Sequence, residues 1–399
     1  MDPNGRSVQR RSILAGLVGS LTVAACGPDQ GTTGTADAAA PRTTPPVPPT
    51  PGVPAAHQAG VTTVPPAAAE VAAYRVTAAG RDGLADVLRR LGAEAAGAGA
   101  GESLTVSAGA SLFDQRYGLA ALRPRRLTEM PAFPSDVLDP AWCHGDLTVQ
   151  ACAATPERAA ELAAQAARVP GLERTWRMPG FRPGNETGRG GRAFTTNLFG
   201  FREGAGNLEA EDTALMDRQV WVRPGADEPA WTAGGTYQVI RLIRFAMPLW
   251  DADPVPKQEA VIGRHKDSAA PLGATRETDT PDYAHDPEGR TISLDSHIRR
   301  ANPRTPDTDG SRILRRSYSY RLDRDATGHD NAGLLFVCYQ HDVEQGFATV
   351  QRRLHGEALE KYVLPFGGGY YFTLPGAGAG TGAGNGGDHL GAALLAAAG

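Results

Sequence analysis

A single histidine among arginines is the most chemically suggestive feature of the sequence. Residues 294–304 read Leu-Asp-Ser-His-Ile-Arg-Arg-Ala-Asn-Pro-Arg. Taken alone, His297 is more typical of a hydrogen-bonded structural histidine than of a metal ligand. An axial ligand to haem iron nevertheless needs only one imidazole, and nearby arginines are natural partners for two propionates.

The second suggestive segment, residues 197–207, is punctuated by glycines and carries one acid, Glu203, between small and apolar residues. Such a loop lets the backbone approach a flat ligand closely, although an ordinary surface turn is equally consistent with the spacing. The glycines do not fit the pattern of a dinucleotide or phosphate loop.

Other metal sites are not favoured by the sequence. His144 with Asp146 and His341 with Asp342 are the right residue types, but neither pair alone makes a metal site without further ligands, and the adjacent residues His341 and Asp342 would point to opposite faces of a strand. Three cysteines remain beyond the leader, without C-x-x-C spacing. Cys338 is expected to be a small buried hydrophobe. Cys143 and Cys152 could pair across a turn, but residues 146–154 alternate like one strand, which disfavours the bridge.

The first residues resemble an export signal. Arg10 and Arg11 precede an apolar run at 12–25 that is too short to span a bilayer, and Val-Ala-Ala-Cys ends it at Cys26. We expect residues 1–26 to direct export by the twin-arginine route and Cys26 to carry a lipid anchor, the chain's only link to the membrane. Cleaved secretion is the alternative.

Composition divides the remainder. Residues 27–66 are rich in Pro, Ala and Thr and predict a tether without a core, and residues 377–399 form a Gly/Ala-rich tail in which Leu390, Leu394 and Leu395 could dock as a short helix. A net charge of -4 argues against nucleic-acid binding.

Between tether and tail, the same order of elements occurs twice. In the first half, strands are expected at 71–77, 103–108, 146–154 and 172–178, with helices at 81–96 and 156–167, the latter capped by Thr155. In the second half, strands are expected at 236–247, 315–322, 333–339 and 370–374, with helices at 257–262 and 343–354. This order predicts an α+β protein of two ferredoxin-like β-α-β-β-α-β domains, 67–230 and 231–376, with facing antiparallel sheets that enclose a cavity.

Several segments together resemble the dye-decolorizing peroxidase family, especially its bacterial deferrochelatase/peroxidase subgroup associated with iron uptake. Besides the two segments above, the resemblance is carried by residues 57–60, 143–146, 231–237, 281–283 and 333–375. It implies one haem b per chain, held by the second domain and covered by the loop at Gly200 to Gly204.

The resemblance also assigns roles to single residues. His297 matches the axial ligand, and Arg315 matches an arginine that stabilises negative charge as a peroxide O–O bond breaks. Leu334 and Phe336 match an apolar wall of the site. Asn302, Pro303 and Arg304 match residues at the haem edge, and Gly204, Ala205 and Gly206 match backbone contacts. Glu360 matches an acid that holds the axial imidazole.

Two departures from the family pattern concern the site. Glu203 stands where the family has aspartate, and its extra methylene displaces the carboxylate that would move the peroxide proton. Ser317 stands where the subgroup commonly has glycine.

The expected function is therefore reduction of hydrogen peroxide with oxidation of an organic donor. Release of iron from haem, with iron-uptake membrane proteins as partners, is a second hypothesis, and assembly into homo-oligomers is compatible with both. The alternative is a haem-scavenging lipoprotein whose catalysis is weakened by Glu203.

Overall fold

The computed structural model describes residues 56–399 except 183–185, 188–192, 325–327, 329 and 379–388. All of them belong to one compact unit that begins at Pro48. The segment expected to direct export, residues 1–26, and most of the expected tether lie outside the described residues. In the described part of the chain, no helix combines the length and apolar character that crossing a membrane requires.

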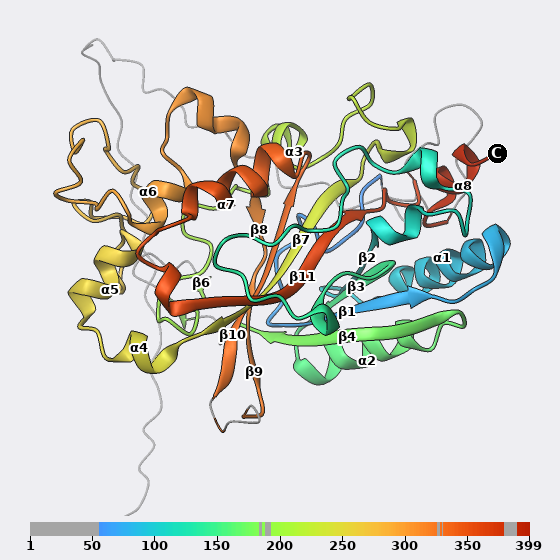
Figure 1. Cartoon of the computed structure of the whole chain (residues 1–399), viewed down its shortest axis with the longest axis horizontal. Helices are drawn as coiled ribbons and strands as arrows, with labels where there is room; N and C mark the ends of the chain where they lie inside the picture. The colour runs from blue at the N-terminus through green and yellow to red at the C-terminus, as the bar shows by residue number, and fades with distance from the viewer. Residues whose placement is uncertain (1–55, 183–185, 188–192, 325–327, 329, 379–388) are drawn as a thin grey trace, which may run out of the picture. The chain divides into compact units, whose positions relative to one another are not determined.

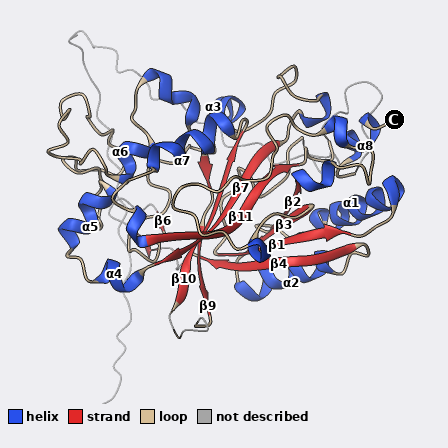
Figure 2. Ribbon diagram, viewed as in Figure 1, coloured by secondary structure: helices blue, strands red, loops and turns tan. Residues whose placement is uncertain are grey.

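The chain combines strands and helices in each of its two halves (Figure 1, Figure 2). The strands are β1 (Ala68–Val76), β2 (Ser103–Gly109), β3 (Leu147–Ala153), β4 (Leu172–Phe181), β5 (Glu186–Thr187), β6 (Ala193–Phe194), β7 (Thr236–Phe245), β8 (Leu314–Arg315), β9 (Tyr318–Leu322), β10 (Asn331–Gln340) and β11 (Val363–Thr373). The helices are α1 (Gly80–Ala96), α2 (Pro156–Ala167), α3 (Thr213–Gln219), α4 (Met247–Asp251), α5 (Val255–Ile262), α6 (His297–Ala301), α7 (Thr349–Leu354) and α8 (Ala392–Ala397).

The larger sheet is antiparallel and continuous, with strand order β7-β11-β2-β3-β1-β4-β9-β10-β8. An additional pairing of β7 with β10 closes it on itself, which leaves few unpaired strand edges. The expected α+β class is confirmed. The two facing sheets that the sequence predicted are instead joined, through β11–β2 on one side and a single residue pair between β4 and β9 on the other.

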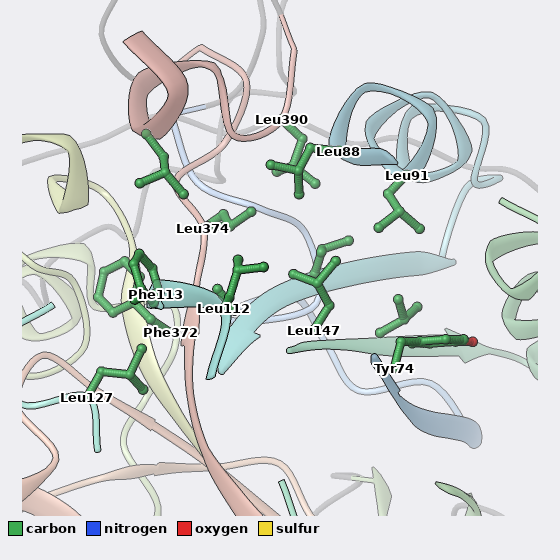
Figure 3. Packing of buried hydrophobic residues seen from close by; sticks show 14 of the residues in the cluster. Tyr74, Leu88, Leu91, Leu112, Phe113, Leu127, Leu147, Phe372, Leu374 and Leu390 are labelled. Atoms are coloured by element: carbon green, nitrogen blue, oxygen red, sulfur yellow. The ribbon is translucent and has the colours of Figure 1, made fainter. Parts of the chain in front are cut away.

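The first half follows the predicted order of elements. Helix α1 buries one face, with Leu84, Leu88 and Leu91 fully covered by the sheet and by the C-terminal segment, as apolar spacing of three and four residues requires. Figure 3 shows Leu88 beside Leu390 and Leu91 directed from the helix toward the strands. Helix α2 begins as predicted, because the Thr155 side chain accepts a hydrogen bond from the Arg158 N–H.

The second half departs from the prediction in three places. The strand expected at 315–322 is interrupted at Arg316 and Ser317, where the Ser317 carbonyl accepts hydrogen bonds from the Arg182 side chain. The helix expected at 343–354 begins as a π-helix, Glu344–Ala348, before α7. Strand β11 begins seven residues before the predicted start at 370. Pro365 and three glycines mask its strand pattern in the sequence, and a register shift accommodates them in the sheet.

Two further predictions concern the tail and the cysteines. Helix α8 confirms the docked terminal helix, with Leu390 and Leu394 buried. Cys143 and Cys152 are both free, and Cys338 is fully buried in β10.

Candidate functional site

A cavity of about 300 Å³ lies in the second half, between the sheet and the short helices. The sheet contributes apolar side chains of β7 and β10, the helices α5, α6 and α7 contribute another wall, and the loop at 197–206 contributes a third. The lining includes Glu203, Gly204, Ala205, Gly206, Arg264, His297, Asn302, Arg304, Arg315, Leu334, Phe336 and Glu357. Pro303 and Glu360 are the two predicted site residues that do not line this cavity.

His297 is the first residue of α6 and projects from the helical wall. Its Nδ1 lies 2.7 Å from Oε2 of Glu357, whose side chain is only 7% exposed. A carboxylate can only accept, so Nδ1 is the donor in this contact, and Nε2 is the ring nitrogen left to bind a ligand. An imidazole fixed in this tautomer is prepared to bind a metal through Nε2, and its acidic partner increases its donor strength.

Glu360 was expected to hold this imidazole, and that prediction is wrong. Glu360 instead accepts hydrogen bonds from the backbone N–H of Gly356 and pairs with Nδ1 of His355 at 3.3 Å. The two acids are three residues apart and lie in one turn, in which the Glu360 N–H donates to the Glu357 carbonyl. Because of this turn, their side chains point in different directions. The sequence showed an acid in this segment but not the turn that decides which acid reaches His297.

Arg315 is positioned by the register of the sheet. It pairs with Cys338 on β10, so its side chain emerges on the same face as Phe336 and Leu334. The alternate residues Leu335 and Val337 are fully buried on the other face. The strand periodicity thus brings one guanidinium and two apolar side chains to the same cavity, as the sequence predicted.

The loop at 197–207 is tied to β8 by three hydrogen bonds. The Asn207 side chain bonds both the N–H and the carbonyl of Arg315, each at 2.9 Å, and Nη2 of Arg315 donates to the Ala205 carbonyl at 2.9 Å. Gly204 and Gly206 adopt φ values of 87° and 69°, which favour glycine. Asn207 was not predicted as a site residue, because its role depends on a contact between segments 108 residues apart.

Glu203 lines the cavity in the same loop and is half-buried. Its backbone N–H donates to the Thr195 carbonyl, which fixes its place in the turn. The neighbouring Arg202 also lines the cavity and pairs with Glu277 at 3.3 Å. The acid that the sequence singled out therefore shares the cavity with Arg315 and His297.

Among the arginines that line the cavity, Arg304 and Arg315 lie close enough to Arg264 to repel it. Arg264 is only 5% exposed, and burial, reinforced by repulsion from Arg315 and Arg304, lowers its pKa to about 10. Its Nη1 donates to the carbonyls of Ala269 and Glu277. The sequence did not identify Arg264, since a single arginine after α5 carries no motif. Such a cluster favours an anionic ligand.

Comparison with known proteins supports one family. Models of the Dyp-type peroxidase N-terminal and C-terminal regions match residues 58–182 and 195–378. The deferrochelatase of Escherichia coli is 48% identical over 295 residues, which cover 73% of this chain and 68% of that protein. A deferrochelatase of Shigella flexneri is similar to the same extent.

Solved structures agree in fold. DtpA from Streptomyces lividans, in an oxyferrous/water mixed complex, is 32% identical with a TM-score of 0.76, covering 86% of this chain and 96% of DtpA. A DyP-type peroxidase from Cellulomonas bogoriensis is 32% identical with a TM-score of 0.74, covering 86% of this chain and 97% of its own. This chain belongs to the Dyp-type peroxidase family.

Proposed function

We propose that this protein is a haem b peroxidase that reduces hydrogen peroxide and oxidises an organic donor. The observation that carries the proposal is the imidazole of His297, held by the buried Glu357 with Nε2 available, in a cavity that also contains Arg315 and Glu203.

The residues present fit haem on three counts. Nε2 of His297 is a suitable axial nitrogen. Leu334, Phe336 and Phe245 offer apolar surface to a flat macrocycle. The arginine cluster offers positive charge to its carboxylates. Haem, when bound, supplies the redox-active iron that accepts the oxidising equivalents of peroxide.

The chain's own groups then have separable tasks. The Glu203 carboxylate takes a proton from one oxygen of hydrogen peroxide and delivers it to the departing oxygen. The Arg315 guanidinium stabilises the negative charge that develops on that oxygen as the O–O bond breaks. The hydrogen bond from Arg315 to the Ala205 carbonyl and those of its backbone to Asn207 orient it, so little reorganisation is needed during the reaction.

The proposal is tested with haem-loaded protein, hydrogen peroxide and an organic dye between about pH 4 and 7, the range in which a carboxylate can exchange a proton. We expect peroxide-dependent dye oxidation that falls when His297 is replaced. Absence of oxidation across the whole range, with haem fully bound, would contradict it.

A haem-scavenging role is the competing function, motivated by Glu203. The variant E203D separates the two. A sharp increase in peroxide turnover would indicate that the glutamate had weakened catalysis, whereas a turnover within a few-fold of the wild-type value would indicate that it already serves as the proton carrier. E277D, which changes a carboxylate bound to Arg202, is the matched control.

Release of iron from haem is a second candidate activity, favoured by the 48% identity to proteins named deferrochelatase. Recovery of metal-free protoporphyrin from haem, above the level given by an Arg315→Ala variant, would support it. Recovery of only intact or bleached haem would count against it. Iron-uptake membrane proteins would then be the partners that receive the iron, and assembly into homo-oligomers is compatible with either activity.

The proposed setting is the cell envelope. The Arg10-Arg11 pair and the Val-Ala-Ala-Cys segment ending at Cys26 support export by the twin-arginine route and a lipid anchor. We also propose that each half, 67–230 and 231–376, is a ferredoxin-like unit, supported by the orders β2-β3-β1-β4 and β11-β7-β10-β9 within the two parts of the sheet.

A further inference from the structure

The two residues that depart from the family pattern, Glu203 and Ser317, line the same cavity. They come from distant segments of the chain, the loop at 197–207 and the segment between β8 and β9. In the family pattern the acid is one methylene shorter, and the subgroup's glycine at position 317 has no side chain. Both departures therefore add side-chain atoms to one cavity, where one change can compensate for the other.

The register of the sheet directs Ser317 toward the cavity. The register of β10 continues unchanged from β8 to β9, and between them the Arg316 N–H donates to the Val337 carbonyl at 2.7 Å. Ser317 is therefore opposite Phe336 and on the same face as Arg315. Because a strand rises about 3.3 Å per residue, the Cα atoms of Arg315 and Ser317 are about 7 Å apart. The added hydroxyl thus lies beside the guanidinium.

The Ser317 hydroxyl is available for a new hydrogen bond. Ser317 is only 4% exposed, and its carbonyl accepts hydrogen bonds from Nε and Nη2 of Arg182 at 3.1 and 2.9 Å. Its hydroxyl, however, has no hydrogen-bond partner among the described residues. A buried hydroxyl can donate one hydrogen bond and accept two, and leaving all of them unmade costs free energy. The backbone of Ser317 is fixed while its side chain can still bind a ligand.

The Glu203 carboxylate is in the same condition. Its backbone N–H is bound to the Thr195 carbonyl at 2.8 Å, but the described part of the chain provides its carboxylate with no hydrogen-bond donor. Arg182 relates it to Ser317. Burial lowers the pKa of Arg182, and the negative charge of Glu203 is among the influences that counter this effect. One guanidinium therefore binds the Ser317 backbone and lies near the Glu203 carboxylate.

We propose that the Ser317 hydroxyl relays a proton between hydrogen peroxide and the Glu203 carboxylate; this rests on the proposed peroxidase function. The hydroxyl oxygen takes a proton from one peroxide oxygen while its own proton passes to the carboxylate, which becomes a neutral acid. The reverse transfers deliver the proton to the other oxygen, which already carries a hydrogen and leaves as water. The electrons for O–O cleavage come from haem, as in the proposed function.

The relay explains why the two departures occur together. The extra methylene of Glu203 displaces its carboxylate by roughly one carbon–carbon bond, which impairs direct proton transfer. A hydroxyl between the carboxylate and the peroxide restores the path, because it accepts and donates at the same time. A shorter aspartate with glycine at position 317 would exchange the proton without the hydroxyl.

The first test measures the second-order rate constant of the haem-loaded protein with hydrogen peroxide by stopped-flow absorption. S317A should lower it by about 10- to 100-fold, because the relaying group is lost. S317T keeps a hydroxyl and should stay within a few-fold of the wild type. If S317A reacts as fast as the wild type, or if S317T is as slow as S317A, the relay is overturned.

A double-mutant cycle tests the dependence on Glu203. S317G should slow the reaction by about 10- to 100-fold when Glu203 is present and change it little in the E203D background, where direct transfer is available. Equal losses in both backgrounds would mean that the serine acts independently of the acid, which contradicts the proposal.

Cyanide association provides a measurement that does not depend on turnover. Hydrogen cyanide also gives up a proton as it binds, so S317A should slow its association with the haem-loaded protein while S317T should not. Carbon monoxide carries no proton, and its association with the reduced protein should be the same in the wild type and both variants. A carbon monoxide rate lowered as much as the cyanide rate would assign the effect to access and overturn the relay.

S319A is the matched control. Ser319 lies on β9, is 3% exposed and is not part of the cavity lining, so the same substitution removes a buried hydroxyl from a neighbouring position. S319A should react with peroxide and cyanide as the wild type does. A loss equal to that of S317A would attribute the effect to the strand and not to the cavity hydroxyl, and would overturn the proposal.

The same measurements separate this inference from the proposed function. If the haem-loaded wild type does not react with hydrogen peroxide, the proposed function fails and the relay fails with it. If the wild type reacts and S317A reacts equally fast, only the relay fails, and the assignments of His297 and Arg315 stand.

Discussion

The two parts of the sheet carry the same order of elements but differ in what covers them. Strands β1 to β4 are covered by α1 and α2, which are 17 and 12 residues long and bury continuous apolar faces. Strands β7, β10 and β11 are faced by α5, α6 and α7, of eight, five and six residues. Figure 1 shows the long helices beside β1 and β4 and the short ones at the other end of the sheet.

This difference explains where the cavity forms. Long amphipathic helices fill the space above a sheet with close-packed side chains. Short helices cannot, and the space between them and β7 and β10 is lined by both apolar groups and arginines. The second part of the sheet therefore borders a cavity where the first part is closely packed. The first part provides a rigid support for the second.

The largest expected effect in the cavity follows removal of Arg315. We predict that R315L lowers the rate constant for reaction with hydrogen peroxide by about 10²- to 10³-fold, because a charge-stabilising donor is lost. The backbone hydrogen bonds to Asn207 remain, so haem should still load. Stopped-flow absorption measures the rate, and R321L, an exposed arginine on β9, serves as the control.

A rate constant for R315L within a few-fold of the wild-type value would mean that the cavity does not activate peroxide through this guanidinium. The closely packed first half and the cavity-bearing second half would then not differ in catalytic role in the way proposed.

The packed half should respond in stability instead. Leu88 is fully buried on the inner face of α1, and we expect L88A to lower the free energy of unfolding by about 2–5 kcal/mol without changing peroxide turnover per haem. Leu334 borders the cavity, so L334A should cost less in the haem-free protein, because one side of its side chain already faces space. Chemical denaturation measures both, and equal losses would refute the difference in packing.

Glu357 tests how the helical wall supports the imidazole. E357Q should weaken haem binding or peroxide turnover by about 10- to 100-fold, because the amide is a weaker acceptor for Nδ1–H of His297. Lower donor strength should also shift the iron reduction potential to a more positive value. E360Q is a close control, since Glu360 bonds His355 and Gly356, and it should leave the potential unchanged.

The smallest effect is expected at the start of α2. T155A removes the cap of the Arg158 N–H and should lower the free energy of unfolding by about 1 kcal/mol, with no effect on the cavity. Thermal unfolding followed by circular dichroism checks this. A change in peroxide turnover would indicate coupling between the halves that the fold does not explain.

The sequence predicted the first half better than the second for a physical reason. Helices α1 and α2 have long apolar periodicity and local caps, which are legible along the chain. Helices α4 and α6 have five residues each, too few for an apolar periodicity to reveal a helix. The glycines and Pro365 of β11 conceal its strand pattern, and pairing with distant strands determines its structure.

The site shows the same limit. His297, Arg315, Leu334 and Phe336 were identified through the family resemblance and share the cavity. Glu357, Asn207 and Arg264 were missed because their roles arise from contacts between distant segments, such as the 60 residues that separate His297 from Glu357. Type and spacing alone could not distinguish Glu357 from Glu360.

The most direct test is the absorption spectrum of haem-loaded His297→Gly, recorded with and without added imidazole. Removal of the side chain should shift the Soret and visible bands away from their wild-type positions, and free imidazole, which can occupy the vacated space, should restore those positions. A variant whose haem content and iron spectrum match the wild type without imidazole would show that this residue does not bind the iron.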